Sequence, residues 1–467
     1  MDESYHPPIL TATDISRGRT MLNRIFRLAE NNTTVRVEII AGITTFLTMA
    51  YIIFVNPAVL ATDFAGEPTG LDPQAVMLAT CIAAAVATII MGLYARYPIA
   101  QAPGMGNNHF FVTVVMGLTA LGITNAWEVA LGIVFISGFT FLLLSVLRVR
   151  QAVIDALSPS LRSGISVGIG LFITFIGLRN GQIVIGEPGT LVGLNADLFA
   201  SGPGVFMIGL LVISVLHARR IIGSILIGVL VAAATAWFLG EVETPSAIFG
   251  VPQIENPAIG RMDLRTALTL ACVPFIIMFV FTDMFDTVGT LVGVTERAGF
   301  MKDGRLPRAN RALVSDAIGT MVGATLGTST VTSYIESAAG VEQGGRTGLT
   351  GVVVAVLFLL ALFMSPLIAL VASFPPITAP ALVVVGVFMA QNVKRVAWDD
   401  ITESLPAFLI MLGIPLTYSI ADGLAIGFVV YPVLKLLSGR GGEVKLLMYI
   451  LAAVMLAYFI FVRAQMG

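Results

Sequence analysis

The chain has 467 residues, of which 57% are hydrophobic and only 12% are charged. Soluble domains carry about 25% charged residues, so this composition excludes an ordinary soluble protein and predicts one embedded in a bilayer. The 26 Lys and Arg residues are balanced by 28 Asp and Glu residues, which argues against a nucleic-acid partner.

Residues 1–35 are polar and lack the apolar stretch of a signal peptide, so we expect a cytoplasmic N-terminal segment. The apolar runs that follow have the length of membrane-spanning helices, not of β-barrel strands. The predicted fold class is therefore an all-α polytopic membrane protein, located in the cell membrane. Seven spans are predicted at 37–59, 74–93, 99–117, 126–147, 161–178, 203–216 and 221–239. Seven more are predicted at 266–287, 311–326, 331–340, 349–364, 378–391, 405–419 and 424–437.

The loop charges predict the direction of each span. Arg and Lys residues near span ends mark the cytoplasmic side, and they occur at alternate loops of this chain, for example at Arg96, Arg219 and Arg308. The loop 61–73 contains three acids and no base, which predicts the outer side. Because the first set contains an odd number of spans, the second set begins from the opposite side of the membrane. The sequence therefore predicts an inverted repeat of 7 + 7 segments.

The third and tenth spans are interrupted at corresponding places in the two sets. They read "YPIAQAPGMGNNHFFVTVV" and "GATLGTSTVTSYIESAAG". In each, a Gly-rich or β-branched stretch resists helix formation before a short helical tail. Broken helices at matching positions of two repeats point to the substrate site of a transporter, where unpaired N–H groups carry partial positive charge.

Four acids lie inside predicted spans near these breaks. Asp283 and Asp286 are three residues apart and share a helix face with Thr287, while Glu336 follows the break of the tenth span. An acid inside a bilayer is costly and predicts a functional site unless it is paired. Capping of the neighbouring broken helices is the alternative role for the first pair. We expect Asp316, within reach of Arg311, to be mainly structural.

Other candidate site residues lie beside these acids. Asn108 offers a donor and an acceptor in one plane, as required to recognise a purine edge, although helix capping is an equal alternative. His109 titrates near neutral pH and is either a core histidine or a proton carrier. Phe110 and Tyr334 are candidate stacking faces for a heteroaromatic ring, with core packing as the alternative.

Several long motifs resemble those of the AzgA-like purine permeases of the nucleobase-cation symporter group. They are "AGITTFLTMAYIIFVNPAVL", "APGMGNNHFF", "DMFDTVGTLVGV", "GTSTVTSYIESAAGVEQGGRTGLT" and "LPAFLIMLGIPLTYSIADGLAIGF". The resemblance implies import of purine nucleobases by symport with protons, or with sodium, in an elevator-like cycle. It also implies a core domain (36–147 and 266–364) that moves against a gate domain (148–265 and 365–441). The C-terminal hydrophobic segment, 442–467, is a fifteenth apolar run, which is either a surface helix, an extra span or the sign of a wrongly divided span.

The resemblance assigns the base-binding acids to Asp283 and Glu336 and the asparagine to Asn108. It leaves Asp286, His109 and Thr287 to proton coupling or site support. The family usually reads "GMGLNAFF" where this chain has "GMGNNHFF", so Asn107 and His109 put the choice among purines in question.

Two further questions stay open at this point. An anion exchanger of the same fold is the alternative function, since anions bind at helix N-termini, but crowded carboxylates argue against it. A homodimer is a further possibility. We expect no enzyme activity, cofactor or metal, because no nucleophile–base pair or metal cluster accompanies the acids.

Overall fold

A computed structural model gives the fold of the chain. It describes residues 21–460 apart from 65, 147–156, 188, 245–246, 248, 253, 255, 301–305 and 458. The first-half helices are α3 (Val35–Met49), α4 (Ile52–Leu60), α5 (Pro73–Ile90), α6 (Met105–Ala120), α7 (Ala126–Val146), α9 (Pro159–Asn180), α10 (Ser201–Ala218) and α11 (Ser224–Phe238). The second-half helices are α13 (Val273–Arg297), α14 (Ala309–Leu326), α15 (Ser337–Glu342), α16 (Gly348–Ala361), α17 (Ser365–Ser373), α18 (Pro375–Ala390), α19 (Ile401–Thr417) and α20 (Ile420–Leu437). Three short helices are α2 (Met21–Phe26), α12 (Leu264–Ala267) and α21 (Leu446–Ala457).

Every predicted apolar segment overlaps a helix, which confirms a mostly helical polytopic protein. Six helical stretches within the described residues are long and apolar enough to cross a bilayer, and shorter apolar helices accompany them. The repeat relation between the two sets of seven stays a prediction. The C-terminal apolar run forms α21, which packs against α20 and has 12 residues. The rest of this run, at 458 and 461–467, lies outside the described residues.

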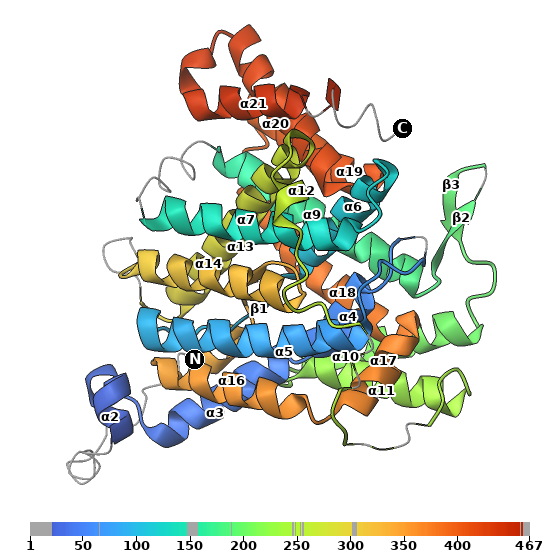
Figure 1. The fold of residues 1–467 in the computed structure, drawn as a ribbon, viewed down its shortest axis with the longest axis vertical. Coiled ribbons are helices and arrows are strands. Elements are labelled where there is room, and N and C mark those ends of the chain that lie inside the picture. Colours follow the sequence, from blue (N-terminus) through green and yellow to red (C-terminus); the bar gives the residue numbers. More distant parts are fainter. Residues whose placement is uncertain are drawn as a thin grey trace, which may run out of the picture.

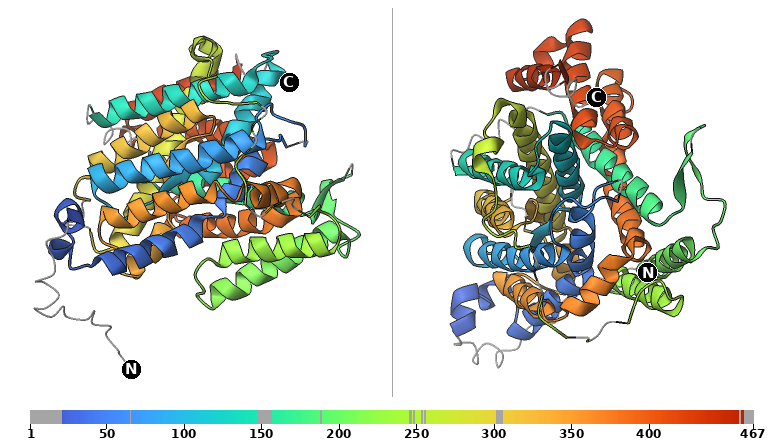
Figure 2. Two further views of the ribbon diagram at one scale, coloured as in Figure 1. Left: turned by 60° about the horizontal axis from the view of Figure 1, so that its bottom comes forward. Right: turned by 45° about the vertical axis from the view of Figure 1, so that its right-hand side comes forward.

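The helices form two packed groups. In the first, α7, α14, α5, α16 and α3 lie side by side in that order, with α13 and α6 behind them (Figure 1). In the second, α9 contacts α18 and α19, while α10 contacts α18 and α11. The two groups stand next to each other in both further views (Figure 2). Their members come from both halves of the chain, so neither group is a contiguous domain.

The all-α prediction is wrong in detail, because two pairs of short strands are present. β1 (Gln101–Pro103) pairs antiparallel with β4 (Val331–Ser333) in the middle of the bundle. β2 (Val184–Glu187) and β3 (Leu191–Leu194) form an exposed hairpin after α9. The strands β1 and β4 lie in the two stretches that were predicted to resist helix formation. They pair because an extended chain in an apolar interior must satisfy the hydrogen bonds of its backbone groups.

The predicted eighth span is displaced along the chain. It was expected at 266–287, but α12 ends at Ala267 and the long helix α13 begins only at Val273. The side chain of Asp263 caps α12 by accepting from the backbone N–H of Thr266, and Pro274 then suits the first turn of α13, where its missing N–H costs nothing. Asp283 and Asp286 consequently lie in the middle of a 25-residue helix, not at its end.

An ionic network joins the ends of α19 and α20. Lys435 is only 1% exposed, and its Nζ lies 2.9 Å from Glu403 and 2.8 Å from Glu443. Arg440 contacts Asp400 and Glu443, each at 2.8 Å. Hydrogen bonds from Thr402 and Arg440 lower the pKa of Asp400 to about 2, and Arg440 with Lys435 lowers that of Glu443 to about 2.

This network predicts a pH-dependent difference in stability. A carboxyl whose folded-state pKa is depressed stabilises the fold above its unfolded pKa, and this contribution disappears as the pH falls through the folded value. We expect Arg440→Gln to lower the unfolding temperature at pH 7. The difference in unfolding temperature between this variant and the parent should become smaller as the pH falls from 4.5 to about 2. Thermal unfolding of both purified proteins across this range tests it. A gap that is the same at every pH would contradict the assignment.

Candidate functional site

The two interrupted segments meet at the centre of the protein. Gln101 pairs with Ser333 and Pro103 with Val331 in the β1–β4 register. One residue separates the end of β1 from the start of α6, and three residues separate the end of β4 from the start of α15, so the start of each helix follows closely on the strand pair. Sequence analysis predicted both breaks, but their direct pairing is a result of the tertiary structure.

One acid network lies wholly inside the first helix group. Asp316, which is fully buried, accepts hydrogen bonds from Thr287 at 2.7 Å, from Gln101 at 2.8 Å and from Ser333 at 3.5 Å. It therefore connects α13, α14, β1 and β4. The expected pairing with Arg311 is wrong, since the guanidinium of Arg311 lies instead over the ring of Tyr94, at 5.6 Å from its centroid.

Asp283 belongs to the same interior. Its side chain is 1% exposed, and Oδ2 accepts a hydrogen bond of 3.2 Å from Thr320 of α14. Its other oxygen, Oδ1, has no hydrogen-bond partner among the described residues, and the charge of Asp316 acts on it. Two carboxyl groups thus interact in a region closed to solvent.

A second pair of acids lies at a more open position. Asp286 and Glu336 are both partly exposed and interact electrostatically with each other. Glu336 Oε1 accepts a hydrogen bond of 2.8 Å from the hydroxyl of Tyr51, a residue at the junction of α3 and α4. Thr332 of β4 interacts with Asp286. The two acids of α13 therefore differ in surroundings: Asp283 is buried against Thr320, whereas Asp286 is partly exposed near Thr332 and Glu336, and its charge also acts on Asp283 and Asp316.

Asn108 lies in the first turn of α6, fully buried. Its Oδ1 accepts a hydrogen bond from Ser329, which precedes β4. Its Nδ2 has no partner among the described residues, and neither has Nδ2 of Asn107. Buried amides are normally hydrogen-bonded, so these unused donors require an explanation. The capping alternative receives no support, because Asn108 follows the start of α6 and its backbone N–H already bonds to Gly104 at 2.8 Å.

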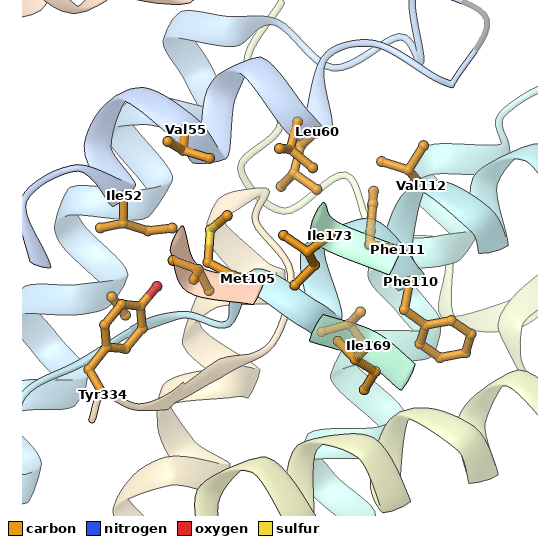
Figure 3. Packing of buried hydrophobic residues seen from close by; sticks show 14 of the residues in the cluster. Ile52, Val55, Leu60, Met105, Phe110, Phe111, Val112, Ile169, Ile173 and Tyr334 are labelled. Atoms are coloured by element: carbon orange, nitrogen blue, oxygen red, sulfur yellow. The ribbon is translucent and has the colours of Figure 1, made fainter. Parts of the chain in front are cut away.

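The two candidate stacking rings lie apart. Phe110 is fully buried, and its ring packs on that of Phe279, with 4.4 Å between centroids. Tyr334 donates a hydrogen bond of 2.5 Å to the carbonyl of Pro103. Figure 3 shows the two rings on opposite sides of the apolar cluster, with Met105 between them. Of the two, Tyr334 lies next to the acid pair, since the charges of Glu336 and Asp286 both act on it.

A cavity of about 860 Å³ opens beside this region and is lined by His109. It extends from the loop 61–72, predicted to lie outside, towards α9 and Tyr418. His109 Nδ1 lies 2.9 Å from the carbonyl oxygen of Met105. Because a carbonyl only accepts, Nδ1 carries the proton and Nε2 of the neutral ring is an acceptor. Nε2 has no partner among the described residues.

Sequence analysis missed the neutral members of the site. Tyr51, Gln101 and Ser329 bond directly to predicted site residues or to Asp316, but a single tyrosine or serine gives no signal in an apolar sequence. Gln101 was the most accessible signal, because a buried primary amide requires partners. No group of three or more metal-ligating side chains occurs in the part of the chain described here, and Cys81 and Cys272 are both buried and unpaired.

Comparisons with known proteins support one family. A model described as a permease family matches residues 36–426. The chain is 42% identical over 440 residues to the adenine permease AdeQ of Escherichia coli, covering 94% of this chain and 96% of the relative. It is 44% identical over 449 residues to the guanine/hypoxanthine permease PbuG of Bacillus subtilis, covering 95% and 100%. Among solved structures, the transmembrane domain of a cyanobacterium bicarbonate transporter, BicA, superposes with a TM-score of 0.63 at 15% identity, covering 83% of this chain and 97% of that domain. This last likeness concerns the fold alone.

Proposed function

The chain belongs to this permease family, as a multi-pass transporter of the cell membrane and not an enzyme, and we propose that it imports purine nucleobases. Relatives that cover nearly the whole chain are named as adenine and as guanine/hypoxanthine permeases. The observation that carries the proposal is the pair of partly exposed carboxylates beside the two broken segments. Purines present several N–H donors, and carboxylates accept such bonds strongly.

Asp286 and Glu336 are our assignment for the base. Both are more accessible than Asp283, and both come from elements that meet at the β1–β4 pair. This exchanges the roles of Asp283 and Asp286 relative to the prediction from family motifs. Tyr51 orients Glu336 through its hydroxyl, and Tyr334 offers the neighbouring ring. In this proposal Phe110 packs on Phe279 of α13 and does not stack on the base.

Asn108 and His109 contribute the remaining polar groups. The unpartnered Nδ2 of Asn108 is a donor for a purine ring nitrogen or carbonyl oxygen, and the buried Nε2 of His109, a residue that lines the large cavity, is an unused acceptor. Specificity of this kind is effective because a buried polar group left unpaired by the wrong base costs free energy.

Proton coupling is assigned to the buried pair. Asp283 has a free carboxylate oxygen and interacts with Asp316, so a bound proton would relieve repulsion between like charges at low dielectric. Thr287 holds Asp316 in position. Because Asp283 and Asp286 share α13, a proton on the first group can influence a base bound to the second. Sodium is the alternative coupling ion.

An elevator-like cycle is supported by the packing of the helices. The four acids of the site, Asp283, Asp286, Asp316 and Glu336, lie in the group formed by α3 to α7 and α13 to α16. This group corresponds to the predicted core. The predicted gate corresponds to α9 to α11 and α17 to α20. In this proposal the inverted 7 + 7 repeat provides the symmetry by which the core moves against the gate and exposes its site alternately to each side.

The same fold also occurs in a bicarbonate transporter, so anion exchange is the alternative function. The relatives named as purine permeases are above 40% identical along nearly the whole chain, whereas the bicarbonate transporter is 15% identical. Several carboxylates in one site would also repel an anion. Both observations favour a purine.

Competitive uptake tests the proposed function. Cells that express the chain should accumulate labelled hypoxanthine, and an excess of unlabelled adenine, guanine or hypoxanthine should each reveal its affinity by competition. Uptake is expected to rise as external pH falls from 7.5 to 5.5 if protons drive it. Uptake that no purine reduces, or that only bicarbonate reduces, would refute purine transport. Dependence on sodium instead of pH would replace only the coupling ion.

A further inference from the structure

A second, smaller cavity is lined by four arginines from separate parts of the chain. It has a volume of about 170 Å³, and its arginines are Arg27, Arg96, Arg308 and Arg346, with Glu30 as an acid at its edge. Arg27 follows α2, Arg96 follows α5, Arg308 precedes α14 and Arg346 precedes α16. All four connections lie at helix ends that loop charge predicts to be cytoplasmic. The concentration of positive charge is not required by the transport mechanism proposed above.

The backbone at three of these arginines adopts an uncommon conformation. Arg27, Arg96 and Arg308 have φ angles of 54°, 59° and 59°, in the left-handed region that residues other than Gly and Asn rarely occupy. Glycine would relieve this strain at each position, yet arginine occupies all three. Strained backbone that persists commonly marks a functional position, and these three arginines line one cavity.

Three of the four guanidinium groups have a contact that positions them, and their charges are largely uncompensated. Arg346 donates to the carbonyls of Val341 and Gly345 at 2.8 and 2.9 Å, and Arg308 lies over the ring of Tyr97, at 4.8 Å from its centroid. Arg27 has an exposed contact with Glu30 at 3.5 Å. Within the described residues, Arg96, Arg308 and Arg346 form no ion pair with a carboxylate.

Two glycines in the lining of the cavity, Gly92 and Gly348, bring their helices close together. Gly92 and Gly348 approach so closely that a Cβ on Gly348 would lie 1.9 Å from the carbonyl oxygen of Gly92, and this close packing of α5 against α16 brings Arg96 towards Arg346. The N–H groups of Thr347 and Thr350 at the start of α16 already bond to Glu38. The arginines are therefore the main donors available to an anion in the cavity.

We propose that this cavity binds the phosphate group of an anionic phospholipid from the cytoplasmic leaflet. The planar guanidinium group of arginine forms two parallel hydrogen bonds with phosphate oxygens. The ammonium group of lysine cannot form such a bidentate pair. The cavity has room for a phosphate but not for a phosphate together with a nucleoside.

A lipid source is favoured by the helix that borders the cavity. α2 exposes Leu22 (39%) and Ile25 (42%) next to Arg24 and Arg27. A short segment that combines apolar and basic side chains in this way is suited to lie in the membrane interface. Each arginine near an anionic leaflet contributes about 1 kcal/mol, or about fivefold in affinity. The bound lipid would fix α2 against α5 and α16.

Lipid binding to the purified full-length chain tests the proposal. Native mass spectrometry would compare phosphatidylglycerol with phosphatidylcholine, and inorganic phosphate would be added as a competitor. The test variant is Arg96→Asn with Arg308→Asn, since Asn tolerates the left-handed backbone and the fold is preserved. The control is Lys394→Gln with Arg395→Gln, an exposed basic pair outside the cavity.

We expect the parent and the control to retain phosphatidylglycerol in preference to phosphatidylcholine, and the test variant, which lacks two arginines, to bind it about 25-fold more weakly. Arg96→Lys with Arg308→Lys should recover part of the affinity. Equal retention of both lipids by the parent, or parent-like retention by the test variant, would overturn the site. Binding of inorganic phosphate without any preference for phosphatidylglycerol would overturn the lipid assignment. Unfolding temperatures in lipid-free detergent should match across the variants, which separates binding from folding.

Discussion

Replacement of Asp286 by asparagine is expected to lower purine uptake by about a hundredfold, because a hydrogen bond to a charged acceptor contributes ~1.5–3 kcal/mol and the purine donor would be left unpaired. Glu336→Gln should have an effect of similar size. Both substitutions keep the shape of the side chain, so the bundle should still assemble. The measurement is initial uptake of labelled hypoxanthine together with binding of the base to purified protein.

Asp283→Asn separates the two acids of α13. It should also stop concentrative uptake, but binding of the base should persist, and the residual exchange of labelled for unlabelled base should lose its dependence on pH. The matched control is Asp399→Asn, an exposed acid outside the site, which should behave like the parent. Normal purine binding by Asp286→Asn, combined with lost binding by Asp283→Asn, would restore the original assignment of the base to Asp283.

The second large effect is expected for Glu38, where the consequence is for stability. This side chain is fully buried and accepts hydrogen bonds from the N–H groups of Arg346, Thr347 and Thr350, and from the Thr350 hydroxyl at 2.6 Å. Glu38→Ala leaves these donors without an acceptor. Since each unsatisfied buried donor costs about 1–3 kcal/mol, the total loss should be at least ~3 kcal/mol.

Thermal or chemical unfolding of the purified chain measures this effect, and Glu38→Gln should recover a part of it because one acceptor oxygen remains. Glu241→Ala, at an exposed loop position, provides the matched control and should change stability little. A loss below about 1 kcal/mol for Glu38→Ala would show that water or a neighbouring group replaces the carboxylate.

Much of the architecture follows from local sequence. Apolar runs of span length predict helices because a bilayer leaves backbone groups no other partner than the helix itself. The same reasoning located the breaks in the third and tenth segments, where β-branched residues and glycines weaken the helix before Met105 and Ser337. Helix boundaries were less predictable, as α13 shows, since Asp263 caps a separate short turn before the long helix begins.

The sequence by itself determined the membrane class, the interrupted segments, the family resemblance and the identity of the acids that lie within lipid depth. Only the tertiary structure decided which groups meet. Asp283 and Asp286 are indistinguishable by spacing, yet the structure buries Asp283 against Thr320 and leaves Asp286 partly exposed near Glu336. Likewise, no local pattern relates Arg27, Arg96, Arg308 and Arg346, which converge at one cavity. The physical reason is that these encounters depend on packing between elements distant in the chain, whereas helix formation depends on neighbours within about four residues.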